Sequence, residues 1–385
     1  METFVVEARR QLHMYPEVGY ELDRTLAFLR SELDKMGVEY TEEYGKSSIV
    51  ATINPEKTGF TIGIRADIDA LPITEETDVA FKSKNEGKMH ACGHDAHTAI
   101  ALDTCRRLNE MRDQINCRVK ILFQAAEEGP YSGANLMVRD GVMEDIDCIV
   151  SLHVDTGYDF GEVSFPVGPQ GGRSDGFYLE FYGKTAHAAN QQAGVDAIMM
   201  AVKAYTEIEF MIAKEIKATD PIIFNVGAIN GGTVNNIICD KCTMYCTLRT
   251  HNEETADYVL GKIKKIISSV AEISGGRAEY IQGKHYPIVL NNECVMKKLE
   301  EAAAKVLPAE KIKPKLTRGM GGEDFSYFAK VKPGGMYRLG VRNIEKCYTA
   351  GLHNSKFMLD EDALEVGVKI FVQFVLDNMN GIDFN

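Results

Sequence analysis

The sequence of 385 residues predicts a two-part α/β protein. We expect a main domain with a mixed, largely parallel sheet flanked by helices, and a ferredoxin-like α+β domain inserted into it. Two observations predict this architecture. Short apolar stretches alternate with segments of helical periodicity through the first part of the chain. After a glycine-rich run at 168–172, the predicted elements follow the order β-α-β-β-α-β, which is typical of ferredoxin-like folds.

The elements of the first part are predicted from apolar spacing and from helix-ending residues such as Gly37. They are, in chain order, helix 3–12, helix 21–36, strand 50–53, strand 60–64, helix 97–111, strand 118–123, helix 132–140 and strand 148–152. Apolar strands that alternate with helices predict a sheet covered on both faces.

The second part is predicted to contain strand 177–182, helix 195–211, strand 222–229, strand 243–250, helix 254–273 and strand 278–282. After about residue 286 the chain returns to segments that can rejoin the first sheet. We therefore expect a discontinuous catalytic domain at 1–171 and 286–385, and an inserted dimerisation or lid domain at 172–285.

Composition excludes several classes of partner. The formal net charge is −13, without a basic block, so nucleic acid and anionic membranes are not expected as partners. No apolar run approaches the ~20 residues of a membrane span, and the first residues lack the layout of a signal peptide. The nine cysteines are scattered, which predicts reduced thiols and a cytoplasmic protein.

A loop before the predicted helix 97–111 concentrates metal-binding side chains. It contains His90, Cys92, His94, Asp95 and His97 within eight positions. Imidazole nitrogen and thiolate sulfur are preferred ligands of zinc-like cations. We therefore predict a metal site, with His94 and His97 on the same helical face.

Further polar residues follow predicted strands. Asp67 and Asp69 come after the strand that ends at Ile64, whereas Glu127 and Glu128 come after strand 118–123. His153 follows the strand 148–152. Because functional groups in such sheets gather at the carboxyl ends of strands, we expect these side chains to lie near the metal-binding loop.

Together these residues resemble the co-catalytic metallo-amidohydrolases, relatives of aminoacylase and glutamate carboxypeptidase. The resemblance is strongest to the branch of hippurate hydrolases, auxin-conjugate hydrolases, N-acetyl-diaminopimelate deacetylases and aminobenzoyl-glutamate hydrolases. The segments that carry it run in family order: His13-x-x-Pro16-Glu17, 65–72, 90–95, 124–129, 183–189, 231–236, 320–325 and His353-Asn354.

The resemblance implies two divalent metal ions per subunit, about 3.5 Å apart. Cys92 would bridge them, His94 and His153 would complete one site, and Glu128 and His353 the other. The excess positive charge would acidify a water molecule and attract a substrate carboxylate. Three residues would lie behind the ligands: Asp67, Asp69 and His97. His13 and His90 are expected to be structural.

The resemblance also assigns roles around the metals. Glu127 would be the general base that takes a proton from the metal-activated water. His187, in the inserted domain, would reach the active site of the partner subunit in a homodimer and stabilise the oxyanion. Asn236 and Arg249 match positions that face substrate. The implied reaction is hydrolysis of the amide bond of N-acyl or N-aroyl amino acids, or of short peptide-like conjugates.

Some features depart from the family pattern or leave alternatives open. Residues 190–192 and Cys239 replace the prolines and histidine that relatives usually carry, which affects specificity more than chemistry. Cys239, Cys242 and Cys246 could form a separate metal site, but buried free thiols are the preferred interpretation. The alternatives to the amidohydrolase are a non-catalytic homologue and a dipeptidase. Zinc, manganese, cobalt and nickel all fit the ligands, and the sequence does not identify the acyl group or the amino acid.

Overall fold

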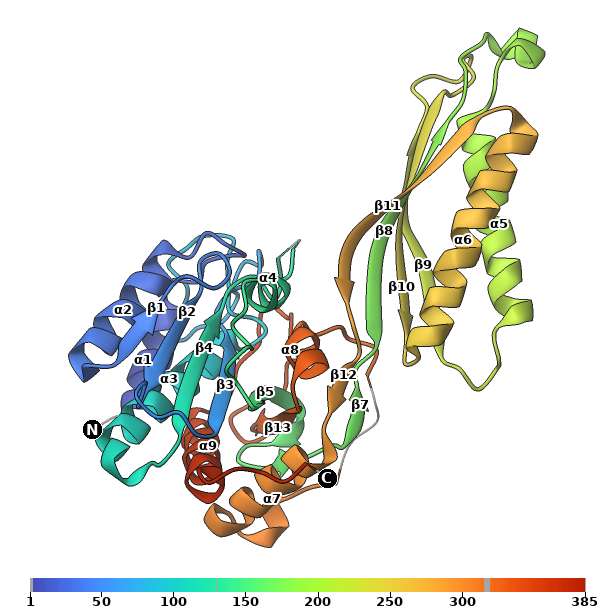
Figure 1. The fold of residues 1–385 in the computed structure, drawn as a ribbon. Coiled ribbons are helices and arrows are strands. Elements are labelled where there is room, and N and C mark those ends of the chain that lie inside the picture. Colours follow the sequence, from blue (N-terminus) through green and yellow to red (C-terminus); the bar gives the residue numbers. More distant parts are fainter. Residues whose placement is uncertain (1–2, 130, 315–318, 385) are drawn as a thin grey trace. The chain divides into compact units, whose positions relative to one another are not determined.

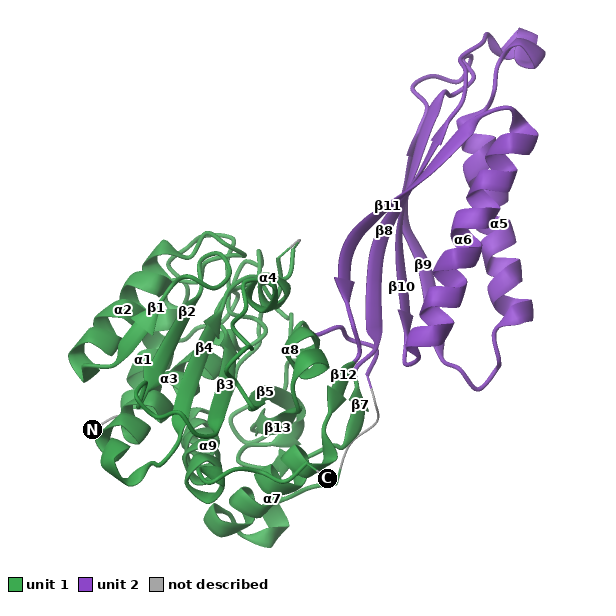
Figure 2. Cartoon of the chain, viewed as in Figure 1, with its two compact units in different colours: residues 1–170, 289–317, 324–385 green, residues 171–288, 318–323 purple. Residues whose placement is uncertain are grey.

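The computed structural model describes residues 3–129, 131–314 and 319–384. The chain forms two compact units, coloured separately in Figure 2. Unit 1 comprises residues 1–170, 289–317 and 324–385, and unit 2 comprises residues 171–288 and 318–323.

The segment 319–323 groups with unit 2, whereas the predicted division placed it in the catalytic domain. Backbone contacts explain the difference. The N–H of Gly172 donates to the carbonyl of Gly321 at 3.0 Å. The Arg249 guanidinium donates to the carbonyl of Met320 at 2.9 Å. This segment is therefore held by the inserted unit, although it lies far from that unit in sequence.

Unit 1 is built on a seven-stranded sheet in the order β1-β2-β4-β3-β5-β13-β6. Its strands are β1 (Glu39–Thr41), β2 (Ile49–Ile53), β3 (Thr61–Asp67), β4 (Arg118–Gln124), β5 (Cys148–Asp159), β6 (Val163–Ser164) and β13 (Gly334–Arg342). The central pairings β4–β3, β3–β5 and β5–β13 are parallel, and the pairings toward the edges are antiparallel. The prediction of a mixed, largely parallel sheet is confirmed.

Helices cover both faces of this sheet (Figure 1). They are α1 (Phe4–His13), α2 (Asp23–Met36), α3 (His94–Glu110), α4 (Gly133–Arg139), α7 (Glu293–Val306), α8 (Phe325–Val331) and α9 (Leu364–Asn378). In β5, Val150 and Leu152 pack into the larger apolar cluster, whereas Ile149 packs into the smaller one on the other face. Each fully buried aliphatic side chain stabilises the fold by about 1.5–3 kcal/mol.

Smaller elements complete unit 1. A two-stranded sheet pairs β7 (Gly168–Gln170) with β12 (Val289–Asn291). Short 3-10 helices span Arg112–Gln114, Ala309–Lys311 and Glu361–Ala363. Among the described residues, no helix has the length and apolar character needed to cross a membrane.

Unit 2 has the predicted ferredoxin-like order. Its antiparallel sheet is arranged β11-β8-β10-β9, and its elements are β8 (Arg173–Tyr182), the 3-10 helix Ala188–Ala193, α5 (Ala197–Glu215), β9 (Ile222–Gly231), β10 (Lys241–Thr250), α6 (Glu253–Ser274) and β11 (Arg277–Tyr286). Figure 1 shows α5 and α6 side by side on one face of the sheet. Phe177, Leu179 and Phe181 alternate along β8 and pack beneath these helices.

Candidate metal centre

The segments that carry the predicted ligands meet at the carboxyl edge of the unit 1 sheet. Asp67 is the last residue of β3, and Glu127 lies three residues after the end of β4. His94 is the first residue of α3, so this helix begins three residues before the predicted start at 97. His153 lies inside β5, which continues to Asp159, and not after a strand as predicted.

Two sets of metal-binding atoms share one thiol. Cys92, His94 and His153 form one set, and Cys92, Glu128 and His353 form the other; within each set the atoms lie within 4.8 Å of one another. The Sγ of Cys92 is 3.6 Å from Nε2 of His153 and 3.3 Å from Nε2 of His353. That second nitrogen is 2.9 Å from Oε1 of Glu128. The geometry therefore suits two cations with Cys92 between them.

Hydrogen bonds fix the protonation of two of these histidines. Nδ1 of His94 lies 2.8 Å from the carbonyl oxygen of Asp69, and Nδ1 of His153 lies 2.7 Å from that of Val154. A carbonyl only accepts, so each Nδ1 carries a proton, and Nε2 is the ring nitrogen that remains for a metal ion. Among the described residues, Nε2 of His94 is buried without a hydrogen-bond partner. Such an orphaned ring nitrogen fits a metal ligand.

The charge of the site also fits divalent cations. Burial raises the pKa of the Cys92 thiol, and the neighbouring Glu128 and Glu127 carboxylates raise it further. A buried thiolate beside two carboxylates requires compensating positive charge. Divalent cations supply that charge, and thiolate, imidazole and carboxylate are all accepted by zinc-like ions.

His97 and Asp67 support the ligands from behind. Nε2 of His97 accepts from the backbone N–H of Val154 at 2.9 Å, so Nδ1 carries the proton and donates to Asp67 Oδ1 at 2.6 Å. Asp67, His94 and His97 also lie close enough to form a third set. Both nitrogens of His97 are already used, however, which argues against a metal there. Although burial opposes it, the charges of His94 and Arg65 keep the pKa of Asp67 well below its usual value.

Asp69 holds the two glutamates. Its Oδ1 accepts from the backbone N–H of Glu127 and its Oδ2 from that of Glu128, both at 3.0 Å. Glu127 is 6% exposed, and its carboxylate groups with His94 and Glu128 within 4.8 Å. Asp69 therefore fixes the backbone from which two neighbouring carboxylates reach the same pocket.

Unusual backbone conformations occur where the ligands are presented. Gly93 has a φ of +83°, and a Cβ at this position would lie 2.4 Å from Cγ2 of Val154. Ala126 and His353 have φ of +54° and +61° although neither is glycine. Each such residue costs about 1–3 kcal/mol, and such strain is concentrated at functional sites.

The predicted residues of unit 2 lie on its surface. His187 is exposed, and its Nδ1 accepts from the N–H of Ala189 at 3.1 Å. A neutral ring therefore carries its proton on Nε2, where it can donate to an anion. Asn236 is exposed, and its carbonyl accepts from the N–H of Ala188 at 2.9 Å. Arg249 is half-buried near the end of β10.

The cysteine cluster of unit 2 belongs to the hydrophobic core. Cys239, Cys242 and Cys246 are buried under the helices. Burial raises the pKa of Cys242 to about 11 and that of Cys246 to about 12. Within the described residues these cysteines do not form a set of metal-binding atoms. Buried free cysteines that pack as small apolar groups account for all three.

Sequence reasoning missed a buried network behind Asp67. Arg65 donates to Asp67 at 2.9 Å, to Gln124 at 2.7 Å and to Asp324 at 2.7 Å. Ser132 also donates to Asp324 at 2.8 Å. The detectable signal was a charged residue in the middle of the apolar strand β3. Its guanidinium ties the ends of β3 and β4 to Asp324, the residue before α8, behind the metal-binding atoms.

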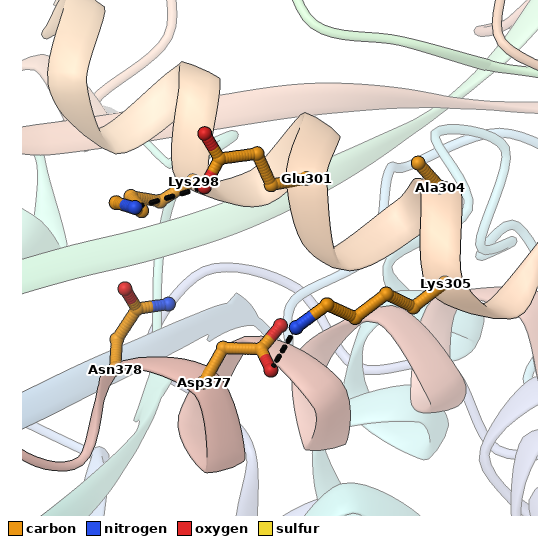
Figure 3. Close-up of a pocket in the computed structure, with 6 residues that line it drawn as sticks. All are labelled: Lys298, Glu301, Ala304, Lys305, Asp377 and Asn378. Carbon is orange, nitrogen blue, oxygen red and sulfur yellow. Dashed lines mark hydrogen bonds and ion pairs between the residues drawn. The ribbon is translucent and has the colours of Figure 1, made fainter.

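A separate hollow of about 410 Å³ lies between α7 and α9 (Figure 3). It is lined by Lys298, Glu301, Ala304, Lys305, Asp377 and Asn378. Two ion pairs, Lys298–Glu301 at 2.8 Å and Lys305–Asp377 at 2.6 Å, satisfy most of its charges. Its lining lacks histidine and cysteine, so we place the functional site at the sheet edge.

Comparisons with known proteins identify the family of this chain. The sequence profile of peptidase family M20/M25/M40 matches residues 63–377. The chain is 34% identical to thermostable carboxypeptidase 1 of Saccharolobus solfataricus, over 95% of this chain and 93% of that protein. It is 32% identical to N-acetyldiaminopimelate deacetylase of Priestia megaterium, over 97% and 98%. The Bacillus subtilis YXEP protein, described as a dinuclear metal-binding peptidase, superposes with a TM-score of 0.80 at 28% identity, over 97% of each chain.

Proposed function

The chain belongs to peptidase family M20/M25/M40 and is a metal-dependent hydrolase of amide bonds, and from that premise we propose its substrates and the roles of its residues. The substrates are N-acyl or N-aroyl amino acids, or short peptide-like conjugates. The observation that carries this proposal is the pair of ligand sets that share Cys92, with the buried Glu127 beside them.

Cys92, His94 and His153 would hold one cation, and Cys92, Glu128 and His353 the other. When bound, the two cations polarise the amide carbonyl and lower the pKa of a water molecule. Zinc or manganese is the proposed native metal, and cobalt or nickel would also suit the thiolate and imidazole donors. The orphaned Nε2 of His94 supports this assignment.

Glu127 is the proposed general base. Its carboxylate would take a proton from the attacking water and deliver it to the nitrogen of the leaving amine. Asp69 orients this carboxylate through the backbone N–H of Glu127. Asp67 and His97 hold the ligand-bearing segments in place, because His97 links Asp67 to the backbone at Val154.

His187 is proposed to stabilise the oxyanion in the active site of a partner subunit, because its Nε2–H is available as a donor. Asn236 and Arg249 are proposed substrate contacts. A homodimer through unit 2 is supported by exposed apolar side chains on α5: Met199 is 43% exposed, Val202 53% and Phe210 61%.

The comparisons favour an enzyme over a non-catalytic homologue. Cleavage of short peptides is the second candidate activity, because one relative is named a carboxypeptidase. We also propose a cytoplasmic location, which the nine free thiols support.

A substrate panel tests the proposed function. Purified protein loaded with zinc, manganese, cobalt or nickel is assayed on N-acetyl, benzoyl, aminobenzoyl and indoleacetyl amino acids and on dipeptides. We expect hydrolysis of at least one N-acyl or N-aroyl amino acid with a kcat/KM well above that for any dipeptide. Hydrolysis of dipeptides alone would establish the second candidate instead.

A further inference from the structure

A row of three polar side chains crosses the sheet beside the metal centre. In the parallel pairing of β5 with β13, His153 is the register partner of Arg338. In the antiparallel pairing of β13 with β6, Arg338 is the register partner of Ser164. Register partners project their side chains to the same face of a sheet, and neighbouring strands are about 4.8 Å apart.

The packing of adjacent residues confirms which face this is. Val163 and Leu339, register partners one position away, both lie in the larger apolar cluster. Met336, two residues before Arg338, projects to the same face as Arg338. It packs in the smaller apolar cluster, which lies on the face opposite to the larger cluster. Arg338 and Ser164 therefore share the face of His153, a proposed metal ligand.

Arg338 is half-buried in β13. Among the described residues, no hydrogen bond or ion pair of its guanidinium is present. Arg342, four positions along the same strand, forms an ion pair with Asp159 at 2.8 Å. In a chain with a net charge of −13, a half-buried arginine without a carboxylate partner is unusual, because desolvating an unpaired charge is costly.

Ser164 adds a second unsatisfied group to the row. Its side chain is 1% exposed, and its Oγ is buried without a hydrogen-bond partner in the described part of the chain. Buried hydroxyls normally have a partner.

We propose that Arg338 and Ser164 form an anion subsite that binds the carboxylate of the amino-acid half of the substrate beside the metal centre. The guanidinium would donate two hydrogen bonds to that carboxylate and the hydroxyl one. This inference rests on the proposed function, because it names the part of the N-acyl amino acid that is recognised. It is separate from Arg249, which lies in unit 2.

Equilibrium binding tests the subsite without turnover. In a Glu127→Gln background, calorimetry measures the Kd of N-benzoylglycine and of its carboxamide, which lacks the negative charge. We expect the acid to bind more tightly than the amide. Adding Arg338→Gln should weaken binding of the acid by about 10- to 100-fold and leave the amide within about twofold. Ser164→Ala should weaken binding of the acid by a smaller factor than Arg338→Gln does.

Two variants provide controls. Arg338→Lys keeps the charge and should recover part of the affinity for the acid. Arg342→Gln removes a charge from the same strand, where it is already paired, and should leave both Kd values unchanged. Metal content is measured for each protein, because an effect transmitted through His153 would lower metal occupancy.

The outcomes separate the subsite from the proposed function. Equal binding of acid and amide by the parent protein, or equal losses for both ligands in Arg338→Gln, would overturn the subsite. If the Glu127-intact protein hydrolyses none of the acids in the substrate panel, the proposed function fails, whatever the binding data give. A preference for the acid that disappears in Arg338→Gln supports the subsite in either case.

Discussion

Two adjacent residues at the start of α3, His94 and Asp95, belong to buried polar clusters of opposite character. Asp95 lies in an ion network in which Arg9 donates to it at 2.9 Å and His13 contacts it at 2.8 Å. The other ring nitrogen of His13 is 3.2 Å from Glu75. In this network each cationic group has a carboxylate partner from the chain itself.

The cluster around Cys92 differs, because its thiol is buried beside the carboxylates of Glu127 and Glu128. His94 and His153 donate through Nδ1 to backbone carbonyls, so that their Nε2 atoms remain for a cation. Cys92, His94 and His153 are buried like Asp95, whereas Glu128 is half-buried and His353 is exposed. We therefore expect the Asp95 network to stabilise the fold by itself, and the Cys92 cluster to need bound cations to balance its buried thiolate.

Removal of metal should have the largest effect. Exhaustive chelation is expected to abolish hydrolysis, and added zinc, manganese, cobalt or nickel to restore it, because the ligand pocket needs cations. Activity and metal content by elemental analysis are measured together. Full activity in a protein shown to be free of metal would refute the dinuclear site.

The next largest effect separates base from ligand. Glu127→Gln keeps the size of the side chain but cannot accept a proton, so kcat should fall by about 10²–10⁴ with normal metal content. Glu128→Gln should lose metal occupancy instead. Kinetics and elemental analysis of the two variants are compared, and exchanged behaviours would mean that the two roles are assigned in the wrong order.

Breaking the Asp95 network should change stability more than chemistry. Arg9→Met removes the guanidinium partner of the buried Asp95 carboxylate, and the free energy of unfolding should fall by about 3–5 kcal/mol. Urea unfolding measures this loss of unfolding free energy. Arg30→Met is the matched control, because the Arg30–Glu42 pair is 38% exposed on each side and should contribute at most about 1 kcal/mol. Equal losses in the two variants would contradict the comparison.

A fourth prediction concerns whether one chain completes the metal pocket. Inactive His187→Ala chains are mixed with inactive Glu127→Gln chains, and the subunits are allowed to exchange. The mixture should regain up to about a quarter of wild-type activity, because each heterodimer has one intact site. Sizing and exchange are verified in parallel. A monomer, or no recovery after demonstrated exchange, would show that His187 does not serve a partner subunit.

The smallest effect is on the pH dependence of stability. Burial and the charge of Arg9 oppose protonation of His13, but Asp95 and Glu75 raise its pKa above the usual value. The stabilisation is then complete below about pH 6.5 and is lost as the pH rises through the folded-state pKa. The difference in unfolding free energy between wild type and His13→Gln should therefore shrink with rising pH. A difference that grows with pH would contradict this sign.

Much of the fold followed from local patterns. The apolar spacing predicted α1 and α2, and the order of elements predicted the ferredoxin-like topology of unit 2. Two boundaries near the site were wrong. The left-handed Gly93 starts α3 at His94 rather than at 97, and pairing with β13 carries β5 past His153. Both depend on neighbours that are distant in sequence.

The sequence by itself determined which donor atoms are present and which kind of element carries each, because periodicity and residue chemistry are local properties. Only the tertiary structure decided which donors share Cys92, how the histidines are protonated, and that Arg338 and Ser164 stand in a row with His153. His353 reaches Cys92 across 261 positions of chain, and strand register sets the row. Such contacts arise from packing between distant segments, which no local pattern encodes.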